Sequence, residues 1–237
     1  MAIPKIIHYC WFGGKPLPGD VKHCIRSWKR MCPEYEIVRW DETNYDVNAH
    51  PFTASAYREE AWAFVSDYAR LRVAYDYGGF YLDTDVELLK NLDFLLDAQC
   101  CIGVQQDRRL CTTGLGFGCI KSSSVVRMML AEYDQLVYEA AQKAELACPY
   151  QNNAVLSKMG YEYCDEIVEL PGVTVFPCRY FDPIAPGKNT ENLLCADTIS
   201  IHRYSNSWGS KYDVLRRRLI GLFGVVRVER LKGLLNG

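Results

Sequence analysis

The stretch of residues 77–87, YGGFYLDTDVE, constrains the fold of this chain more than any other part of it. Two adjacent glycines suit the end of a helix, because glycine accepts the left-handed backbone of a helix C-cap. The apolar residues after them are typical of a buried strand that leads into Asp83 and Asp85. Side chains alternate along a strand, so both aspartates are expected to point into one crevice while Thr84 points away.

Two carboxylates on an apolar strand are costly to remove from water unless a cation lies between them. Mg²⁺ and Mn²⁺ take hard oxygen ligands, and they often bind through one or two carboxylates together with substrate phosphate. The pattern therefore predicts a divalent metal, Mn²⁺ or Mg²⁺, that carries a diphosphate. An Asp-x-Asp pair is a weak signal when it stands alone.

Residues 59–77 carry apolar side chains on most helical faces, which predicts a buried helix. Asp67 and Arg70 interrupt this pattern and, being three residues apart, lie on one helix face. One interpretation is an ion pair that satisfies itself inside the core. The other is that both side chains reach the crevice of the aspartates, where an arginine fork would bond to sugar hydroxyls, a phosphate or the carboxylates.

Strands and helices alternate along the rest of the chain, which predicts an open α/β sheet with ligands beyond the carboxyl ends of its strands. The length of 237 residues and the 49% of hydrophobic residues fit one domain. The expected strands are 5–11, 36–40, 100–104, 115–120, 167–170, 173–176 and 198–202. The other expected helices begin at an Asp20 N-cap or span 125–142 and 152–158.

Several segments in this order resemble glycosyltransferase family 32, which has a sugar-binding region with a DXD motif. The segments are SDYARL at 66–71, YGGFYLDTD at 77–85, IPKIIHYCWFGG at 3–14, YEIVRWD at 35–41 and HRYSNSW at 202–208. The family includes fungal initiating mannosyltransferases and bacterial capsule enzymes, and the large glucosylating toxins share its core. The resemblance runs from about residue 3 to residue 208.

The resemblance implies a GT-A-type nucleotide-sugar-binding sheet flanked by helices, in a domain of residues 1–208. It implies a metal-dependent, retaining glycosyltransferase that moves a sugar from a UDP- or GDP-sugar to a hydroxyl of a glycan or lipid-linked acceptor. Surface or capsular polysaccharide synthesis is the expected setting. Segments 105–118 and 149–153 are expected to be polar loops that wall the acceptor site.

Residue roles follow from the matched motifs. The expected catalytic residues are Asp83, Asp85, Arg70 and Trp208. The expected donor-binding residues are Trp11, Asp67, Arg70, Asp83, Ser207 and Trp208. The expected metal ligands are Asp85, His202 and Asn206; the related toxins have an acidic second ligand in the closing segment, for which His202 is the nearest candidate here. Trp11 has two interpretations, a stacking platform for the donor base or an ordinary core tryptophan.

The eleven cysteines are scattered without a CxxC pair, so we expect mostly buried, reduced thiols rather than a zinc site. Neither a signal peptide nor a run of eighteen apolar residues is evident, which favours a cytoplasmic protein.

From Arg203 onward eight basic residues stand against two acidic ones. Segment 209–237 is a basic, amphipathic helical sequence that either contacts an anionic inner membrane face peripherally or packs back on the domain. Nucleic acid is disfavoured, because no nucleic-acid motif accompanies these charges.

Two other functions remain open on the sequence. The first is a sugar-nucleotide-binding protein without catalysis, although Asp83, Asp85, Arg70 and Trp208 are all intact. The second is a phosphatase of the haloacid dehalogenase type, which also has Asp-x-Asp after a hydrophobic strand. That class normally continues with Gly-Thr, whereas this chain continues with Val-Glu.

Overall fold

An eight-stranded mixed sheet forms the centre of the computed structural model, which describes residues 2–187 and 190–205. Its strand order is β2-β1-β3-β7-β5-β9-β8, with β6 paired to β5. The strands are β1 Ile6–Cys10, β2 Glu36–Trp40, β3 Gly79–Tyr81, β5 Cys100–Gln105, β6 Leu110–Thr112, β7 Phe117–Cys119, β8 Val168–Leu170 and β9 Val173–Phe176. A second, two-stranded sheet pairs β4 Val86–Leu88 with β10 Ser200–His202.

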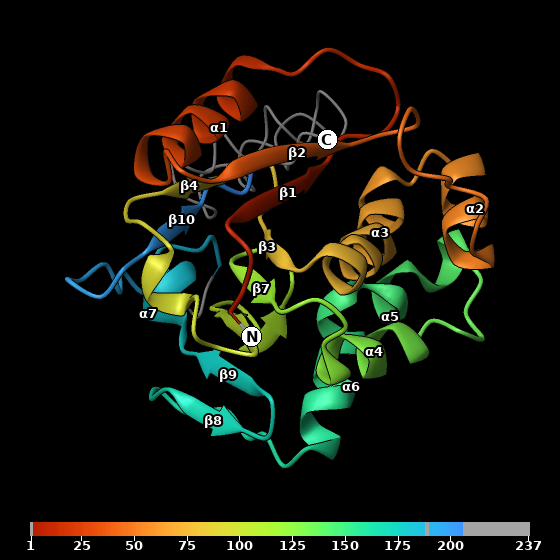
Figure 1. The fold of residues 1–237 in the computed structure, drawn as a ribbon. Helices are drawn as coiled ribbons and strands as arrows, with labels where there is room; N and C mark the ends of the chain where they lie inside the picture. Colours follow the sequence, from red (N-terminus) through yellow and green to blue (C-terminus); the bar gives the residue numbers. More distant parts are fainter. Residues whose placement is uncertain (1, 188–189, 206–237) are drawn as a thin grey trace, which may run out of the picture. The chain divides into compact units, whose positions relative to one another are not determined.

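Helices flank this sheet, which confirms the expected α/β architecture. They are α1 Gly19–Met31, α2 Pro51–Arg58, α3 Trp62–Tyr77, α4 Ser124–Ala131, α5 Lys143–Leu146, α6 Cys148–Lys158 and α7 Cys178–Phe181, with 3₁₀ turns at Asp93–Leu95 and Ala140–Gln142. Figure 1 shows α2 to α6 gathered to the right of the sheet, with α1, α7 and the β4–β10 pair to its left. Within the described ranges, no helix combines the length and the apolar character that crossing a membrane requires.

The strand directions bring several chain segments to one edge of the sheet. β1 runs parallel to β2 and β3, and β5 runs parallel to β9. β7 is antiparallel to both β3 and β5, so β3 and β5 point the same way. The carboxyl ends of β1, β2, β3, β5 and β9 therefore lie at the same edge, which is where ligands bind in open α/β sheets.

Helix α3 is buried on most sides, as its sequence predicts. It packs on β1, β3 and β7 of the sheet, and α2 and α4 cover it from the other side. Val65, Ala69, Leu71 and Ala74 have no exposed surface. A charged residue on such a helix has to find a partner inside the protein.

The two glycines end α3 as expected and turn the chain directly into β3. Gly78 is the C-cap, with φ +70°, and Gly79 has φ +103°. A Cβ atom on Gly79 would lie 2.8 Å from the carbonyl oxygen of Ile6. Both the backbone conformation and the contact with β1 therefore require glycine at this position.

The two aspartates do not lie on the strand, which corrects the alternation argument. β3 ends at Tyr81, and Asp83 and Asp85 belong to the turn that follows it. The Val86 N–H donates to the carbonyl oxygen of Asp83 at 2.9 Å and closes this turn. The turn allows the two carboxylates to reach different partners.

Three helix boundaries also differ from the prediction. The helix expected over 125–142 ends at Ala131. The supposed loop 149–153 lies inside α6, since proline is well accommodated in a first helical turn. α1 has Pro18 as its N-cap, with Asp20 inside its first turn. Helix α2 and strand β4 were not predicted.

The prediction for the cysteines is confirmed in that most are buried. All eleven are free thiols, and only Cys164 and Cys195 are exposed. Burial raises the pKa of Cys100 and Cys119, so these thiols stay protonated in the core.

We expect Gly79→Ala to lower the free energy of unfolding by more than Gly160→Ala does. Gly160 also has positive φ, +90°, but an added Cβ there meets nothing within 4 Å. Gly160→Ala should cost about 1–2 kcal/mol for the left-handed backbone alone, and Gly79→Ala should cost more because of the contact with Ile6. Chemical denaturation measures both, and equal losses would contradict the role given to this contact.

Candidate functional site

Arg70 joins helix α3 to the turn that carries the two aspartates. Its Nη2 atom lies 3.1 Å from Asp67 Oδ1 and 3.1 Å from Asp83 Oδ1. The guanidinium lies over the ring of Tyr81, 4.8 Å from its centroid, and Nε donates to the carbonyl oxygen of Ser66 at 3.1 Å. The two interpretations of Asp67 and Arg70 thus combine: they form an ion pair, and the same arginine holds Asp83.

Asp67 is the more deeply placed of the two carboxylates. Its Oδ2 accepts from the backbone N–H of Cys148 at 3.3 Å, at the start of α6. Burial raises the pKa of Asp67 to about 6, although the nearby Arg70 charge acts in the opposite direction. Burial also raises the pKa of Asp83, against the same Arg70 charge. The cluster holds two acidic groups around one arginine, and the Asp83 side chain is 30% exposed.

Gly114 makes room for the Asp83 carboxylate. Its carbonyl oxygen accepts from the Asp83 N–H at 2.9 Å, which ties the loop between β6 and β7 to the aspartate turn. A Cβ atom on Gly114 would lie 2.0 Å from Asp83 Oδ2 and 3.0 Å from Arg70 Nη1. Any side chain at this position would therefore displace Asp83 or Arg70.

Asp85 faces the late strand β10 rather than Arg70. The antiparallel pairing of β4 with β10 places His202 opposite Val86, next to Asp85. His202 Nε2 lies 3.1 Å from Asp85 Oδ1, and the Arg203 N–H donates to the carbonyl oxygen of Asp85 at 2.8 Å. Burial lowers the pKa of His202, but the charge and hydrogen bond of Asp85, together with the charges of Asp182 and Asp83, outweigh this effect and raise the pKa to about 9.

The residues proposed as metal ligands fit a divalent ion in their chemistry. Asp85 and His202 offer an oxygen and a nitrogen side by side, a donor set that Mn²⁺ accepts. Within the part of the chain that the structure describes, no three His, Cys, Asp or Glu side chains form a metal-binding group. The third expected ligand, Asn206, lies outside the described residues. The ligand set therefore stays a prediction.

Trp11 follows β1 at the same edge of the sheet. Its side chain is 2% exposed, and its indole N–H donates to the carbonyl oxygen of Lys15 at 2.6 Å. The stacking of Trp11 on the donor base stays a prediction. Ser207 and Trp208 lie outside the described residues, as does segment 209–237.

Sequence reasoning missed several residues that hold this site together. Cys148 lies 3.8 Å from Arg70 Nη1 through its sulfur, and Tyr81 donates its hydroxyl to Asp83 at 3.2 Å. Gly114 had a detectable signal in the run GLGFG at 114–118, because repeated glycines in a strand region often mark a close approach of other groups. Cys148 carried no such signal.

Comparison with known proteins also points to the region that contains Arg70 and the two aspartates as the functional site. Residues 18–102 match the family described as the glycosyltransferase sugar-binding region containing the DXD motif. The match includes the α3 helix, the glycine turn and both aspartates. Residues 18–102 are therefore similar to the DXD-containing sugar-binding region of glycosyltransferases, which confirms the resemblance found in the sequence.

One relative is similar to this chain in part of its sequence, and one solved structure is similar in fold. The chain is 37% identical over 103 residues to Inositol phosphoceramide mannosyltransferase 3 of Schizosaccharomyces pombe, a match over 40% of this chain and 28% of that protein. The chain thus matches less than a third of that relative's length. The solved structure of PaToxG Glycosyltransferase has a TM-score of 0.53 at 20% identity over 66% of this chain and 69% of its own, which shows a shared fold. A glycosyltransferase involved in glycosylation of the major capsid of PBCV-1 has a TM-score of 0.46 at 13% identity, over 89% of this chain and 97% of its own.

We expect the free energy of unfolding to fall as pH rises from about 4 to about 6. The folded state holds a proton on Asp67 in this window, because its pKa is raised, whereas the unfolded state has released that proton. The effect is at most about 3 kcal/mol. Asp67→Asn should show a flatter profile in chemical denaturation, with part of the decline left because the pKa of Asp83 is also raised. Asp97→Asn, at an exposed position, is the control, and a full decline in Asp67→Asn would contradict this prediction.

Proposed function

We propose that this chain is a metal-dependent, retaining glycosyltransferase that moves a sugar from a nucleotide-diphosphate donor to a hydroxyl of a glycan or lipid-linked acceptor. A UDP- or GDP-sugar is the donor class, and surface or capsular polysaccharide synthesis is the setting. The family match over residues 18–102 supports transfer of a sugar. The enzyme would act in the cytoplasm, with peripheral contact at the inner membrane face through segment 209–237.

The observation that carries this proposal is the arrangement around Arg70. One buried guanidinium lies 3.1 Å from Asp67 on α3 and 3.1 Å from Asp83 in the turn after β3. The same turn brings Asp85 to His202. Here the fork fixes a partly exposed carboxylate, Asp83, at the edge of the sheet where ligands bind.

Each carboxylate would have a separate task. Asp83 and Asp67 would accept hydrogen bonds from ribose and sugar hydroxyls, and Arg70 would orient the donor sugar by keeping these acids in place. Because Arg70 cannot be deprotonated in a protein, the arrangement has its full charge wherever the two carboxylates are ionised. Trp11 would stack on the donor base, and Ser207 and Trp208 would lie near the glycosyl–phosphate bond.

Asp85, His202 and Asn206 would hold the divalent metal, Mn²⁺ or Mg²⁺. When bound, the ion supplies positive charge against the diphosphate leaving group. His202 binds a metal only as neutral imidazole, so its raised pKa means that a proton has to leave the His202–Asp85 pair first. Once that proton has left, Asp85 remains a negatively charged carboxylate that can bind the ion.

The acceptor hydroxyl would supply the nucleophile. No side chain in the described cluster stands apart as a nucleophile: Asp67 and Asp83 are both bonded to Arg70, and Asp85 is bonded to His202. Attack by the acceptor on the same face as the departing diphosphate would retain the anomeric configuration. The chain's own contribution is to orient the donor and to offset the charge of the leaving group.

Asp85→Ala should abolish sugar transfer while leaving the fold intact, because Asp85 would be a metal ligand. The assay is a panel of nucleotide sugars with Mn²⁺, scored by release of nucleotide diphosphate with and without a chelator. Asp97→Ala, an exposed aspartate elsewhere, is the control. Transfer by Asp85→Ala at nearly the wild-type rate, or wild-type transfer that the chelator does not affect, would refute the metal role.

Gly114→Ala should lower kcat/KM for the donor by about tenfold or more, since its Cβ would push Asp83 away from the position that Arg70 gives it. A tenfold loss corresponds to about 1.4 kcal/mol of transition-state stabilisation. Circular dichroism and thermal unfolding check that the variant is folded. A folded Gly114→Ala with unchanged kinetics would show that Asp83 can shift without consequence.

A further inference from the structure

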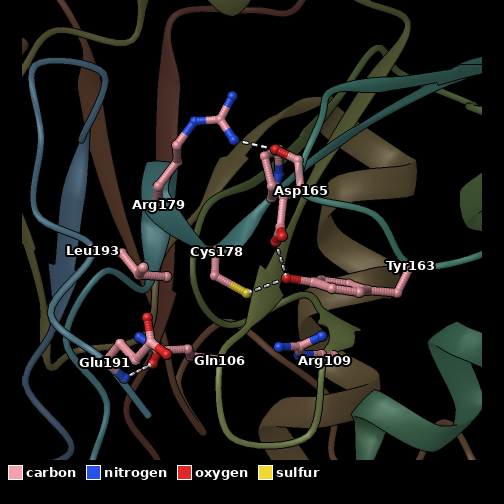
Figure 2. A pocket seen from close by; sticks show the side chains of 9 residues that line it. Gln106, Arg109, Tyr163, Asp165, Cys178, Arg179, Glu191 and Leu193 are labelled. Atoms are coloured by element: carbon pink, nitrogen blue, oxygen red, sulfur yellow. Dashed lines mark hydrogen bonds between the residues drawn. The ribbon is translucent and has the colours of Figure 1, made fainter.

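A cavity opens at the edge of the sheet that carries the aspartate turn. Its volume is about 290 Å³, near the lower end for ligand pockets. It lies where β5 and β9 end, and its lining residues are Gln106, Arg109, Tyr163, Asp165, Pro177, Cys178, Arg179, Glu191 and Leu193. Figure 2 shows Glu191 and Leu193 on one side of this cavity and Arg109 and Tyr163 on the other.

Gln106 makes a rigid wall of the cavity. Its side chain is almost fully buried, and Nε2 donates to the carbonyl oxygens of Asp182 and Pro183 at 3.3 and 3.2 Å. Its Oε1 accepts from the Glu191 backbone N–H, and its own backbone N–H donates to Asp182 Oδ2 at 2.8 Å. The segment that bears Glu191 is therefore fixed to the end of β5.

Two charged groups face the cavity without an ion pair among the described residues. The Arg109 guanidinium lies over the ring of Tyr163, 4.7 Å from its centroid, and Arg109 adopts a left-handed backbone with φ +55°. The Glu191 carboxylate forms no salt bridge within the described ranges, even though Arg109 lines the same cavity. One wall thus offers donors and the opposite wall offers acceptors.

The other two charged residues of the lining, Asp165 and Arg179, already have hydrogen-bond or ion-pair partners. Tyr163 donates its hydroxyl to Asp165 Oδ1 at 2.5 Å. Arg179 donates to the backbone carbonyl of Asp165 and lies 3.6 Å from Glu166 and 3.8 Å from Asp197. The lining as a whole carries two arginines and two acids, so it favours neither an anion nor a cation.

A ligand with many hydroxyl groups matches this lining best. Hydroxyls both donate and accept, so one sugar ring can satisfy the Arg109 fork and the Glu191 carboxylate together. Leu193 and Pro177 add apolar surface, which the C–H face of a sugar ring can cover. A phosphate would meet Glu191 and Asp165 as like charges.

The cavity is separated from the aspartate turn along the sheet. β7 lies between β3 and β5, and β9 lies beyond β5. Neighbouring strands are about 4.8 Å apart, so the ends of β5 and β9 lie roughly 10–14 Å from the end of β3. This distance exceeds one sugar ring, so a sugar in the cavity would not be the unit that reacts at Asp83.

We propose that this cavity binds a neutral sugar unit of the acceptor, at least one unit away from the hydroxyl that receives the donor sugar. This inference rests on the proposed glycosyl transfer and makes the acceptor an oligosaccharide. Arg109 and Glu191 are its binding residues.

The test is binding of the full chain to an array of neutral di-, tri- and tetrasaccharides and of their uronic-acid and phosphorylated counterparts. Wild type is expected to bind at least one neutral oligosaccharide. Arg109→Ala and Glu191→Gln should each weaken that binding about tenfold or more, as expected for loss of a hydrogen bond to a charged group. Arg127→Ala, at an exposed arginine of α4 without an ion pair among the described residues, is the matched control. The bound saccharide, used as acceptor, should show a KM raised by a similar factor in Arg109→Ala.

Several results would overturn the inference: no neutral saccharide bound, a preference for the anionic counterparts, or equal weakening in Arg127→Ala. Failure of the proposed function has a different signature. In that case wild type would release no nucleotide diphosphate from any nucleotide sugar, whatever the array shows.

Discussion

The interaction on which the site depends is the contact of Arg70 with two carboxylates. Arg70 is 4% exposed and comes from a helix whose buried residues are mostly apolar. Removing one partner from a buried ion pair typically costs about 3–5 kcal/mol, because the other charge is left without compensation. Arg70 therefore connects the stability of α3 to the position of Asp83, and the site cannot be rearranged without a cost to the fold.

Several backbone features make the contact between Arg70 and the two carboxylates possible. The glycine turn at Gly78 and Gly79 brings β3 back beside β1 directly after α3, so that Asp83 returns to the helix that holds Arg70. Gly114 leaves the space that the Asp83 carboxylate occupies. The Cys148 N–H at the start of α6 supplies the remaining partner of Asp67. Four separate segments thus meet at one guanidinium.

The sequence predicted what is local and missed what is assembled from distant segments. The helix, its glycine ending and the shared face of Asp67 and Arg70 follow from spacing within about twenty residues. The alternation argument for Asp83 and Asp85 was wrong, because β3 has only three residues and a turn follows it. The Cys148 contact and the cavity at Arg109 and Glu191 depend on how segments that are distant in the sequence pack together. No local sequence pattern encodes this packing. The α/β class of the sheet was predictable, since strands and helices alternate along the chain. The insertion of β7 as an antiparallel strand between β3 and β5 was not predictable.

The pairing of Asp85 with His202 has a consequence for the order of events during synthesis. The two residues are 117 positions apart in the chain. A ribosome adds about 5–20 residues per second, so Asp85 would exist for roughly 6–23 seconds before His202 is made. During this interval the aspartate turn has no imidazole beside it. A metal site that needs both residues therefore forms only after β10 has been added, and a chain that stops short of β10 would carry the aspartates without it.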